Sequence, residues 1–206
     1  MQFASDNAGP VHPAIFAALS EANAGYATAY GNDTIMDDVT RALRDIFEAP
    51  EAAVYLVTTG TAANSISLAC LAQPWQTIFC SQIAHIHEDE CGCPELFTGG
   101  AKLTPVTVED GKIQAAALKA AIEGEETRGV HGVQRGPVSI TQATERGTVY
   151  TLEEIEALTG VARSYGLPVQ LDGARFANAL VTLGCTPAEM TWRAGVDAVS
   201  FGATKN

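Results

Sequence analysis

Basic residues are scarce in this chain of 206 residues. It has 12 Lys and Arg against 24 Asp and Glu, which gives a formal net charge of -12 with neutral histidines. A charge of this sign repels the phosphates of nucleic acids and the surfaces of anionic membranes. We therefore exclude nucleic-acid and membrane binding from the expected functions and expect a small-molecule partner.

Long apolar runs are also missing. No stretch approaches the roughly 18 apolar residues that a membrane-spanning helix requires. The first residues, Met1 to Asp6, lack the basic segment and apolar run of a secretory signal. We therefore expect a cytoplasmic protein. An odd number of scattered cysteines predicts reduced thiols rather than a disulfide framework; they are Cys70, Cys80, Cys91, Cys93 and Cys185.

The rest of the chain alternates between strand and helix patterns, as in parallel α/β folds. An apolar content of 47% is enough for one core, and no repeat, linker or low-complexity stretch marks an internal boundary. Strands are expected at 54–57, 78–80, 103–108, 138–141, 169–172 and 196–201. Helices are expected after Pro13, from Thr34 to before Pro50, after Gly60, over 115–122 and after Thr151, which forms a capping box with Glu154.

A turn with a central glycine, Thr59-Gly60-Thr61, connects the first predicted strand to a helix. Backbone N–H groups at a helix N-terminus, together with two hydroxyls, can hold a phosphate. The same residues also form ordinary capped turns. The turn has neither the lysine of a P-loop nor the glycine spacing of a dinucleotide fingerprint. From these residues alone, both interpretations stay open.

An acidic residue follows another predicted strand, in Asp172-Gly173-Ala174-Arg175. Open α/β sheets bind their ligands at the carboxyl ends of strands. Asp172 there can pair with a protonated pyridine nitrogen, and Arg175 can reach the ring oxygen or a phosphate. The alternative is an ordinary ion pair in a loop at a strand end.

A lysine follows the last predicted strand, in Ser200-Phe201-Gly202-Ala203-Thr204-Lys205-Asn206. Small residues allow a flat ring to approach Lys205, whose amine can form a Schiff base. A single lysine is also commonly just solvated. The specificity comes from the order of three features: a phosphate turn, then an acid after a strand, then a lysine after a later strand.

Histidines and cysteines lie close together at His85, His87, Cys91 and Cys93. Zinc sites space their cysteines by two to four residues, whereas this pair is Cys-x-Cys without a second pair elsewhere. We therefore predict no metal site. Taken alone, His85 is more typical of a hydrogen-bonded turn residue than of a catalytic one.

Together these segments resemble the low-specificity L-threonine aldolases, which are fold-type I pyridoxal-phosphate enzymes. The resemblance rests on Ser5-Asp6-Asn7, 29–33 (Ala-Tyr-Gly-Asn-Asp), Asn64 after the glycine turn, Ala84-His85-Ile86, Asp172 to Arg175, and Thr204-Lys205-Asn206. These motifs occur in the same order along essentially the whole chain. Residues 89–95 and 142–145 resemble the branch that includes phenylserine aldolases.

The resemblance implies a fold and a domain. The expected class is α/β, a fold-type I PLP-dependent transferase-like large domain with a mostly parallel central sheet flanked by helices. Residues 1–206 would form this pyridoxal-phosphate-binding domain with its N-terminal segment, and the C-terminal small domain of the family would lie outside this chain. The assembly would be a homo-oligomer, a dimer or tetramer with shared active sites.

The resemblance also assigns roles to residues. Lys205 would carry pyridoxal 5'-phosphate as a Schiff base, and Asp172 would hold its pyridine nitrogen. Arg175 would contact the ring hydroxyl side, and His85 would stack on the ring face. Three residues would hold the phosphate: Thr59, Gly60 and Thr61. Two would bind substrate: Ser5 at the carboxylate and Tyr30 at the border of the site.

The implied reaction is the retro-aldol cleavage of L-threonine, L-allo-threonine or phenylserine-like substrates to glycine and an aldehyde. His85 is the leading base for the β-hydroxyl proton, because imidazole titrates near neutral pH. Glu88 and Glu90 are the next candidates. The chain departs from many relatives at Thr144, where they have a histidine, so a base role there is in doubt.

Two other hypotheses stay open. The same cofactor contacts serve other fold-type I enzymes, such as aminotransferases and β-eliminating lyases. The chain could also be an inactive fragment that folds without catalysing a reaction.

Overall fold

The structure is a computed structural model that describes residues 4–205. These residues divide into two compact units. The first contains the chain up to Val54 together with Lys205, and the second contains residues 55–204. The sequence shows no linker at this division, and the expected single domain over 1–206 stays a prediction.

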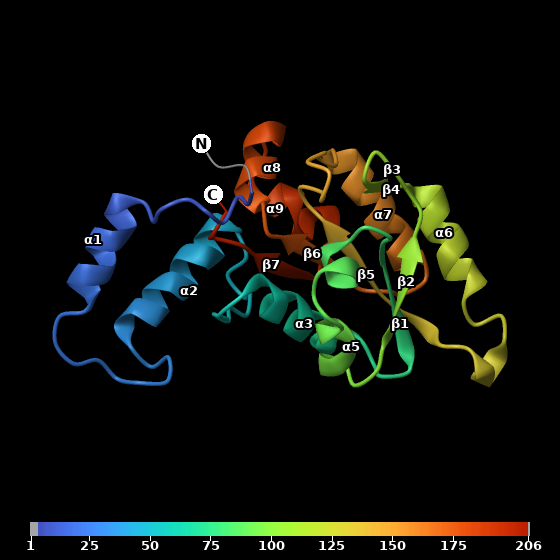
Figure 1. Ribbon diagram of the computed structural model, residues 1–206, viewed down its shortest axis with the longest axis horizontal. Coiled ribbons are helices and arrows are strands. Elements are labelled where there is room, and N and C mark those ends of the chain that lie inside the picture. The colour runs from blue at the N-terminus through green and yellow to red at the C-terminus, as the bar shows by residue number, and fades with distance from the viewer. Residues whose placement is uncertain (1–3, 206) are drawn as a thin grey trace. The chain divides into compact units, whose positions relative to one another are not determined.

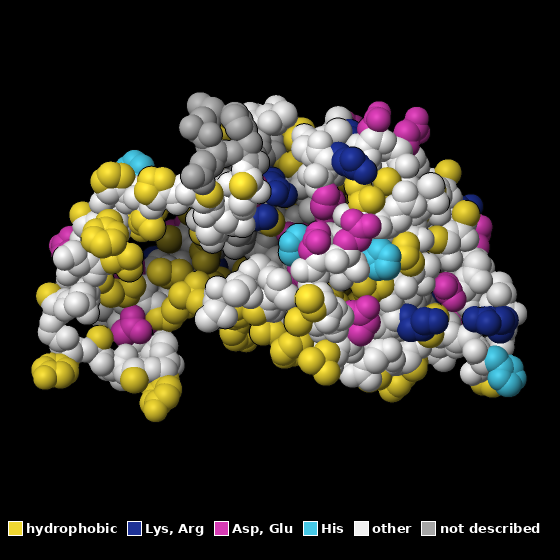
Figure 2. Space-filling model, viewed as in Figure 1, with side chains coloured by type: hydrophobic (Ala, Val, Ile, Leu, Met, Phe, Trp, Pro, Cys, Tyr) yellow, Lys and Arg dark blue, Asp and Glu magenta, His cyan; other side chains and the backbone are white. Residues whose placement is uncertain are grey.

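Two helices make up most of the first unit: α1 (Pro13–Ala22) and α2 (Thr34–Ile46). Proline at the first position favours the start of α1, and Asp33 caps α2 by accepting the N–H of Met36 at 2.9 Å. Both helices were expected from the sequence. None of their residues is buried, and Phe16 is 68% exposed. The hydrophobic side chains of this unit are visible at its surface in Figure 2.

A five-stranded sheet is the centre of the second unit (Figure 1). Its strands, in spatial order, are β2 (Lys102–Val106), β1 (Gln76–Ser81), β5 (Gln134–Thr141), β6 (Val169–Gly173) and β7 (Ala198–Phe201). All four neighbouring pairs are parallel. The predicted class, an α/β fold with a mostly parallel sheet, is therefore confirmed.

The sheet is flanked by helices, as a parallel sheet requires. Helices α3 (Gly60–Leu71) and α5 (Cys93–Phe97) pack together, and α6 (Ala115–Gly124) packs with α7 (Leu152–Ser164) (Figure 1). Thr151 and Glu154 form the predicted capping box of α7. The smaller elements are α4 (His85–Glu88), α8 (Phe176–Leu183), α9 (Pro187–Met190), β3 (Val108–Glu109), β4 (Lys112–Ile113) and 3-10 turns at Gly129–His131 and Trp192–Ala194.

The core is apolar where α3 and α4 meet β1. Leu68, Ile78, Cys80 and Ile86 are each at most 2% exposed and belong to one cluster. All five cysteines are free thiols, as the sequence predicted. Burial raises the pKa of the Cys80 thiol to about 12, with smaller contributions from nearby glutamates.

One predicted strand is wrong. Residues 54–57 form no strand, and Tyr55 is 83% and Leu56 66% exposed. Their β-branched and aromatic composition favours an extended backbone, but a strand forms only where its N–H and C=O groups find a neighbouring strand. The sheet of the described residues gives this run no partner.

Within the described range 4–205, no helix is both long and apolar enough to cross a membrane.

Candidate active site

A buried carboxylate lies at the carboxyl end of β6. Asp172 is 3% exposed and accepts one hydrogen bond on each oxygen. Oδ1 accepts from the N–H of Ala174 at 3.0 Å, and Oδ2 accepts from Nδ2 of Asn64 at 2.8 Å. A carboxylate has about four lone-pair sites, so each oxygen keeps room for a further donor.

Strand register brings polar side chains next to this aspartate. Asp172 pairs with Thr141 of β5 on one side and with Ser200 of β7 on the other. Gly173 permits this close approach, because a Cβ at that position would lie 2.8 Å from the carbonyl oxygen of Ser200. The carboxyl ends of three parallel strands therefore meet where open α/β sheets bind ligands.

Asn64, one turn into α3, connects two carboxylates. It is 2% exposed, and its Nδ2 donates to Oδ2 of Asp172 at 2.8 Å and to Oε1 of Glu90 at 2.9 Å. Its Oδ1 accepts from Nε2 of Gln170 at 3.0 Å. Every hydrogen-bonding atom of this amide thus has a partner, which fixes its orientation.

Gln170 lies in β6 and orients Asn64 through the hydrogen bond to its Oδ1. Its Nε2 also donates to Oγ of Ser200 at 3.1 Å, and its Oε1 accepts from Oγ of Ser139 at 2.6 Å. Gln170 is 0% exposed. A buried amide is tolerated because its hydrogen bonds are made.

His85 is the first residue of α4, and it is held from two sides. Its N–H donates to Oε1 of Glu145 at 2.8 Å, and its Nδ1 lies 2.9 Å from Oε1 of Glu90. The His85 side chain is 41% exposed, whereas that of Glu90 is 0% exposed. The ring therefore has a fixed inner edge and an accessible outer part. Figure 2 shows histidine and acidic side chains close together at the surface of the second unit.

Burial changes the acidity of the two glutamates. The pKa of the Glu90 carboxyl is raised from its ordinary value of 4.5, mainly by burial, although hydrogen bonds from Asn64 and His85 lower it. The pKa of Glu145 is raised for the same main reason, and the nearby charge of Asp172 adds to it in both cases. Neither Oε2 of Glu90 nor Oε2 of Glu145 has a hydrogen-bond partner among the described residues.

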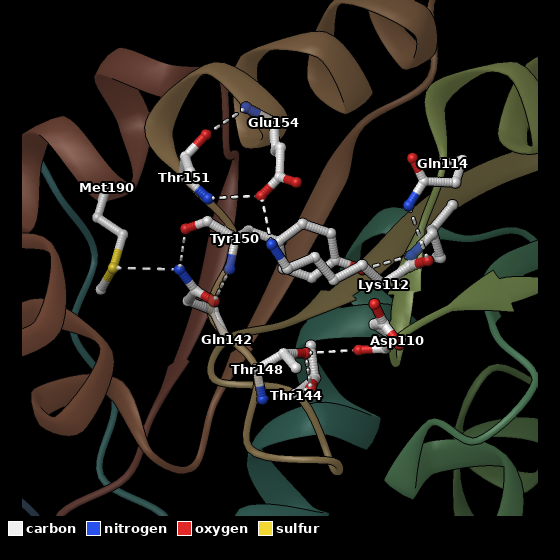
Figure 3. A network of polar contacts seen from close by, with 11 residues as sticks. Asp110, Lys112, Gln114, Gln142, Thr144, Thr148, Tyr150, Thr151, Glu154 and Met190 are labelled. Atoms are coloured by element: carbon white, nitrogen blue, oxygen red, sulfur yellow. Dashed lines mark hydrogen bonds and ion pairs between the residues drawn. The ribbon is translucent and has the colours of Figure 1, made fainter.

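A polar network supports the loop that carries Glu145 (Figure 3). The side chain of Gln142 donates to the carbonyl of Tyr150 at 2.9 Å and accepts from its N–H at 3.0 Å. The Tyr150 hydroxyl accepts from the N–H of Ile113 at 2.7 Å. These hydrogen bonds hold the two ends of the loop together, and Glu145 within it accepts the N–H of His85 at the start of α4.

Thr144 belongs to the same support. It is 1% exposed, and its hydroxyl lies 2.7 Å from that of Thr148 (Figure 3). The Thr148 hydroxyl in turn donates to the carbonyl of Asp110 at 2.7 Å. Thr144 therefore stabilises the loop, which agrees with the doubt that the sequence raised about a base there.

The predicted phosphate turn forms the N-terminus of α3. Thr59 is its cap, and its hydroxyl accepts the N–H of Ala62 at 3.0 Å. Thr59 and Gly60 are exposed, and a Cβ added at Gly60 would meet nothing within 4 Å. The first N–H groups of a helix have no partner inside it and attract anions. Asn64 lies four residues after Gly60. One turn of α3 therefore separates the helix N-terminus from the residue that contacts Asp172.

The other residues predicted for the site are Arg175 in the second unit and Ser5, Tyr30 and Lys205 in the first. Arg175 is the cap residue of α8 and is partly buried. In the first unit, the Ser5 hydroxyl accepts the N–H of Asn7 at 3.1 Å, and Tyr30 is fully exposed with a left-handed φ of 63°. Lys205 has Nζ 3.9 Å from Oδ1 of Asp6.

The structure thus brings together Asp172, His85 and the turn before Asn64 in one unit. Sequence reasoning gave no role to Asn64, Gln170 or Glu145. One signal could have found Gln170: it is a polar residue between Val169 and Leu171 in a strand expected to be buried. Over residues 4–205, no group of three or more His, Cys, Asp and Glu side chains is arranged to hold a metal ion.

Comparison with known proteins gives consistent matches. The family model described as beta-eliminating lyase matches residues 2–206. The low-specificity L-threonine aldolase of Pseudomonas aeruginosa is 43% identical over 206 residues, and that of a Pseudomonas sp. is 42% identical. Each alignment covers 100% of this chain and 58% of the relative.

A solved structure, the threonine aldolase of Leishmania major, matches with a TM-score of 0.90 at 31% sequence identity. The match covers 98% of this chain and 58% of that one. The chain therefore spans 58% of the length of these relatives, and the match extends across nearly all of its own residues.

Proposed function

The chain belongs to the beta-eliminating lyase family, and from this premise we propose that it is the cofactor-holding part of a threonine aldolase. The reaction would cleave L-threonine, L-allo-threonine or a related β-hydroxy-α-amino acid into glycine and an aldehyde. Two Pseudomonas relatives that align with the whole chain are named low-specificity L-threonine aldolases, which supports this activity.

The expected cofactor is pyridoxal 5'-phosphate, and the second unit carries groups that fit it. A protonated pyridine nitrogen needs a buried anion, and Asp172 is a 3% exposed carboxylate that accepts one side-chain or loop hydrogen bond on each oxygen within the described residues. A phosphate needs N–H donors, and the open N-terminus of α3 at Thr59, Gly60 and Thr61 supplies them. Arg175 would contact the ring hydroxyl side.

Lys205 would attach the cofactor covalently. It follows the last residue of β7, Phe201, by four residues, after the small residues Gly202 and Ala203. This position and the family membership support the assignment. Ser5 would bind the substrate carboxylate, and Tyr30 would border the substrate.

Pyridoxal phosphate, when bound, supplies an electron sink for the electrons of the Cα–Cβ bond that breaks. The protein must remove the proton of the β-hydroxyl, so that the departing carbon becomes an aldehyde carbonyl. His85 is the proposed base, through Nε2, because Nδ1 is engaged with Glu90 at 2.9 Å. The Glu90 side chain is 0% exposed, so it is too buried to receive this proton directly. Glu88 is exposed at the end of α4, and the described residues show no hydrogen bond between its side chain and this network.

The observation that carries the proposal is the bridge made by Asn64. Its amide joins the proposed pyridine partner, Asp172, to Glu90 and hence to the proposed base, His85. These groups come from α3, β6 and the α4 region. The proposed electron-sink partner and the proposed proton acceptor, the two groups that Cα–Cβ cleavage requires, thus belong to one hydrogen-bonded network.

The test is a coupled assay for acetaldehyde released from L-threonine and from L-allo-threonine, with and without added pyridoxal phosphate. We expect acetaldehyde that depends on the cofactor. Cofactor binding without acetaldehyde would favour another fold-type I reaction, such as transamination or β-elimination. Failure to bind the cofactor would identify an inactive fragment. Cytoplasmic location and a homotetramer with shared sites stay predictions, which fractionation and light scattering can check.

A further inference from the structure

Glu90 is a buried acid without an obvious structural need. Its side chain is 0% exposed, it lies just beyond α4, and only one of its oxygens is hydrogen-bonded within the described residues. Burying a carboxylate costs several kcal/mol in general, so an apolar side chain would serve packing better. Oε1 contacts two groups, Nδ1 of His85 and Nδ2 of Asn64.

The chemistry of the groups around Asn64 fixes which of them donates and which accepts in each hydrogen bond. An ionised carboxylate can only accept, so the atom of Asn64 that faces both Asp172 and Glu90 must be the donor Nδ2. Oδ1 of Asn64 then accepts from Nε2 of Gln170. Oε1 of Glu90 is therefore an acceptor in its bond with Asn64.

The same oxygen meets Nδ1 of His85 at 2.9 Å. Because a carboxylate oxygen has two lone pairs, it can accept from both neighbours at once. Nδ1 of a neutral His85 then carries the ring proton, and Nε2 carries the free lone pair. The hydrogen bonds that Glu90 accepts on both sides favour its charged form, against the effect of burial.

We infer that Glu90 is a positioning residue that holds His85 in its Nδ1–H tautomer and so makes Nε2 the proton-accepting atom of the ring. The inference rests on the proposed function only for what Nε2 does next. Glu90 touches neither the cofactor nor the substrate in this scheme. Its effect passes through His85.

A positioning role and a purely structural role of Glu90 predict different effects for conservative substitutions. In Glu90→Gln, the side-chain oxygen can still accept from His85 and Asn64, and the new NH2 takes the place of the oxygen that has no partner. In Glu90→Leu, the shape is roughly kept and both acceptors are lost. Asp89→Asn is the matched control, because it removes one exposed carboxylate charge from the adjacent position.

The experiment reads the tautomer directly by two-bond 15N–1H correlation on protein labelled at histidine, at neutral pH. The His85 signals are assigned by their loss in His85→Phe. We expect the Nδ1–H pattern in the wild type, in Asp89→Asn and in Glu90→Gln, and its loss in Glu90→Leu. An Nε2–H pattern in the wild type would overturn the inference, whether or not the leucine variant folds.

Turnover of L-threonine is the second measurement. Glu90→Gln should stay within about tenfold of the wild type, whereas folded Glu90→Leu should lose about 100-fold or more in kcat with a smaller change in KM. An equal loss in both variants would overturn the inference, because it would mean that the charge and not the acceptor matters. If no variant and no wild type cleaves threonine while the tautomer pattern holds, the proposed function fails and the positioning role stands.

Discussion

Replacing Asp172 by asparagine should destabilise the fold as well as slow the reaction. The aspartate accepts on both oxygens, from the N–H of Ala174 and from Nδ2 of Asn64. Asparagine has one acceptor oxygen, so in either orientation its NH2 faces another donor. Asn64 cannot turn over to help, because its oxygen would then face Glu90 and its nitrogen would face Gln170.

The size of the effect follows from two opposing contributions. Losing one buried hydrogen bond and leaving donors opposed costs about 1–3 kcal/mol in the free energy of unfolding. Removing the Asp172 charge relieves repulsion of Glu90 and Glu145, but that repulsion is a smaller cause of their raised pKa values than burial. We therefore expect the lost hydrogen bond to outweigh the relieved repulsion, so that the free energy of unfolding decreases. The variant should still fold, because domains typically have about 5–15 kcal/mol of stability.

Urea unfolding at neutral pH, followed by circular dichroism, measures the change. Asp197→Asn is the control: Asp197 is exposed and accepts one N–H, that of Val169, at 2.8 Å, so its amide can keep this bond and expose its NH2. We expect the control to change by less than about 0.5 kcal/mol. If Asp172→Asn unfolds at the same urea concentration as the control, the described network is wrong. Turnover by Asp172→Asn should also fall by at least ~100-fold, and near wild-type turnover would remove Asp172 from the mechanism.

Three further predictions concern the site. Borohydride reduction of the cofactor-loaded protein, followed by peptide mapping, should place the pyridoxyl group on Lys205, and a label on any other lysine contradicts that assignment. His85→Phe should bind the cofactor yet lose roughly 100- to 10,000-fold in turnover if His85 is the base; full activity would leave it only a stacking role. Burial raises the pKa of Glu145 above its ordinary 4.5, so the folded state holds this proton more tightly and stability falls as pH rises through the raised pKa. The stability gain of Glu145→Gln over the wild type in urea should therefore grow with pH from about 4.5 upward and then level off, and a constant difference would show that the Glu145 pKa is not raised.

Much of the fold could be predicted from local sequence signals. The capping box at Thr151 and Glu154 and the apolar run before Asp172 specify their elements through contacts within a few residues. The run at 54–57 shows the limit, because an extended segment becomes a strand only with a partner that local sequence does not reveal. The short helix α4 was also missed, since four residues carry no periodicity.

The site was predictable in part for a similar reason. Asp172 follows a strand directly, and its position is set by the rule for parallel sheets. Asn64 bridges Glu90 and Asp172, which lie 26 and 108 positions from it along the chain. No spacing rule relates them. The direction of its hydrogen bonds depends on two carboxylates that only the folded chain brings to the same amide nitrogen.

The amide of Asn64 also determines whether protons can pass between the two carboxylates that it contacts. It touches both carboxylates, Asp172 and Glu90, and so transmits their electrostatic influence. An amide N–H does not give up its proton in neutral water, so Asn64 cannot act as a proton relay. A proton taken up at His85 therefore cannot reach Asp172 through Glu90 and Asn64. If His85 is the base and Asp172 holds the pyridine nitrogen, proton transfer at the substrate would not neutralise the Asp172 carboxylate through Asn64.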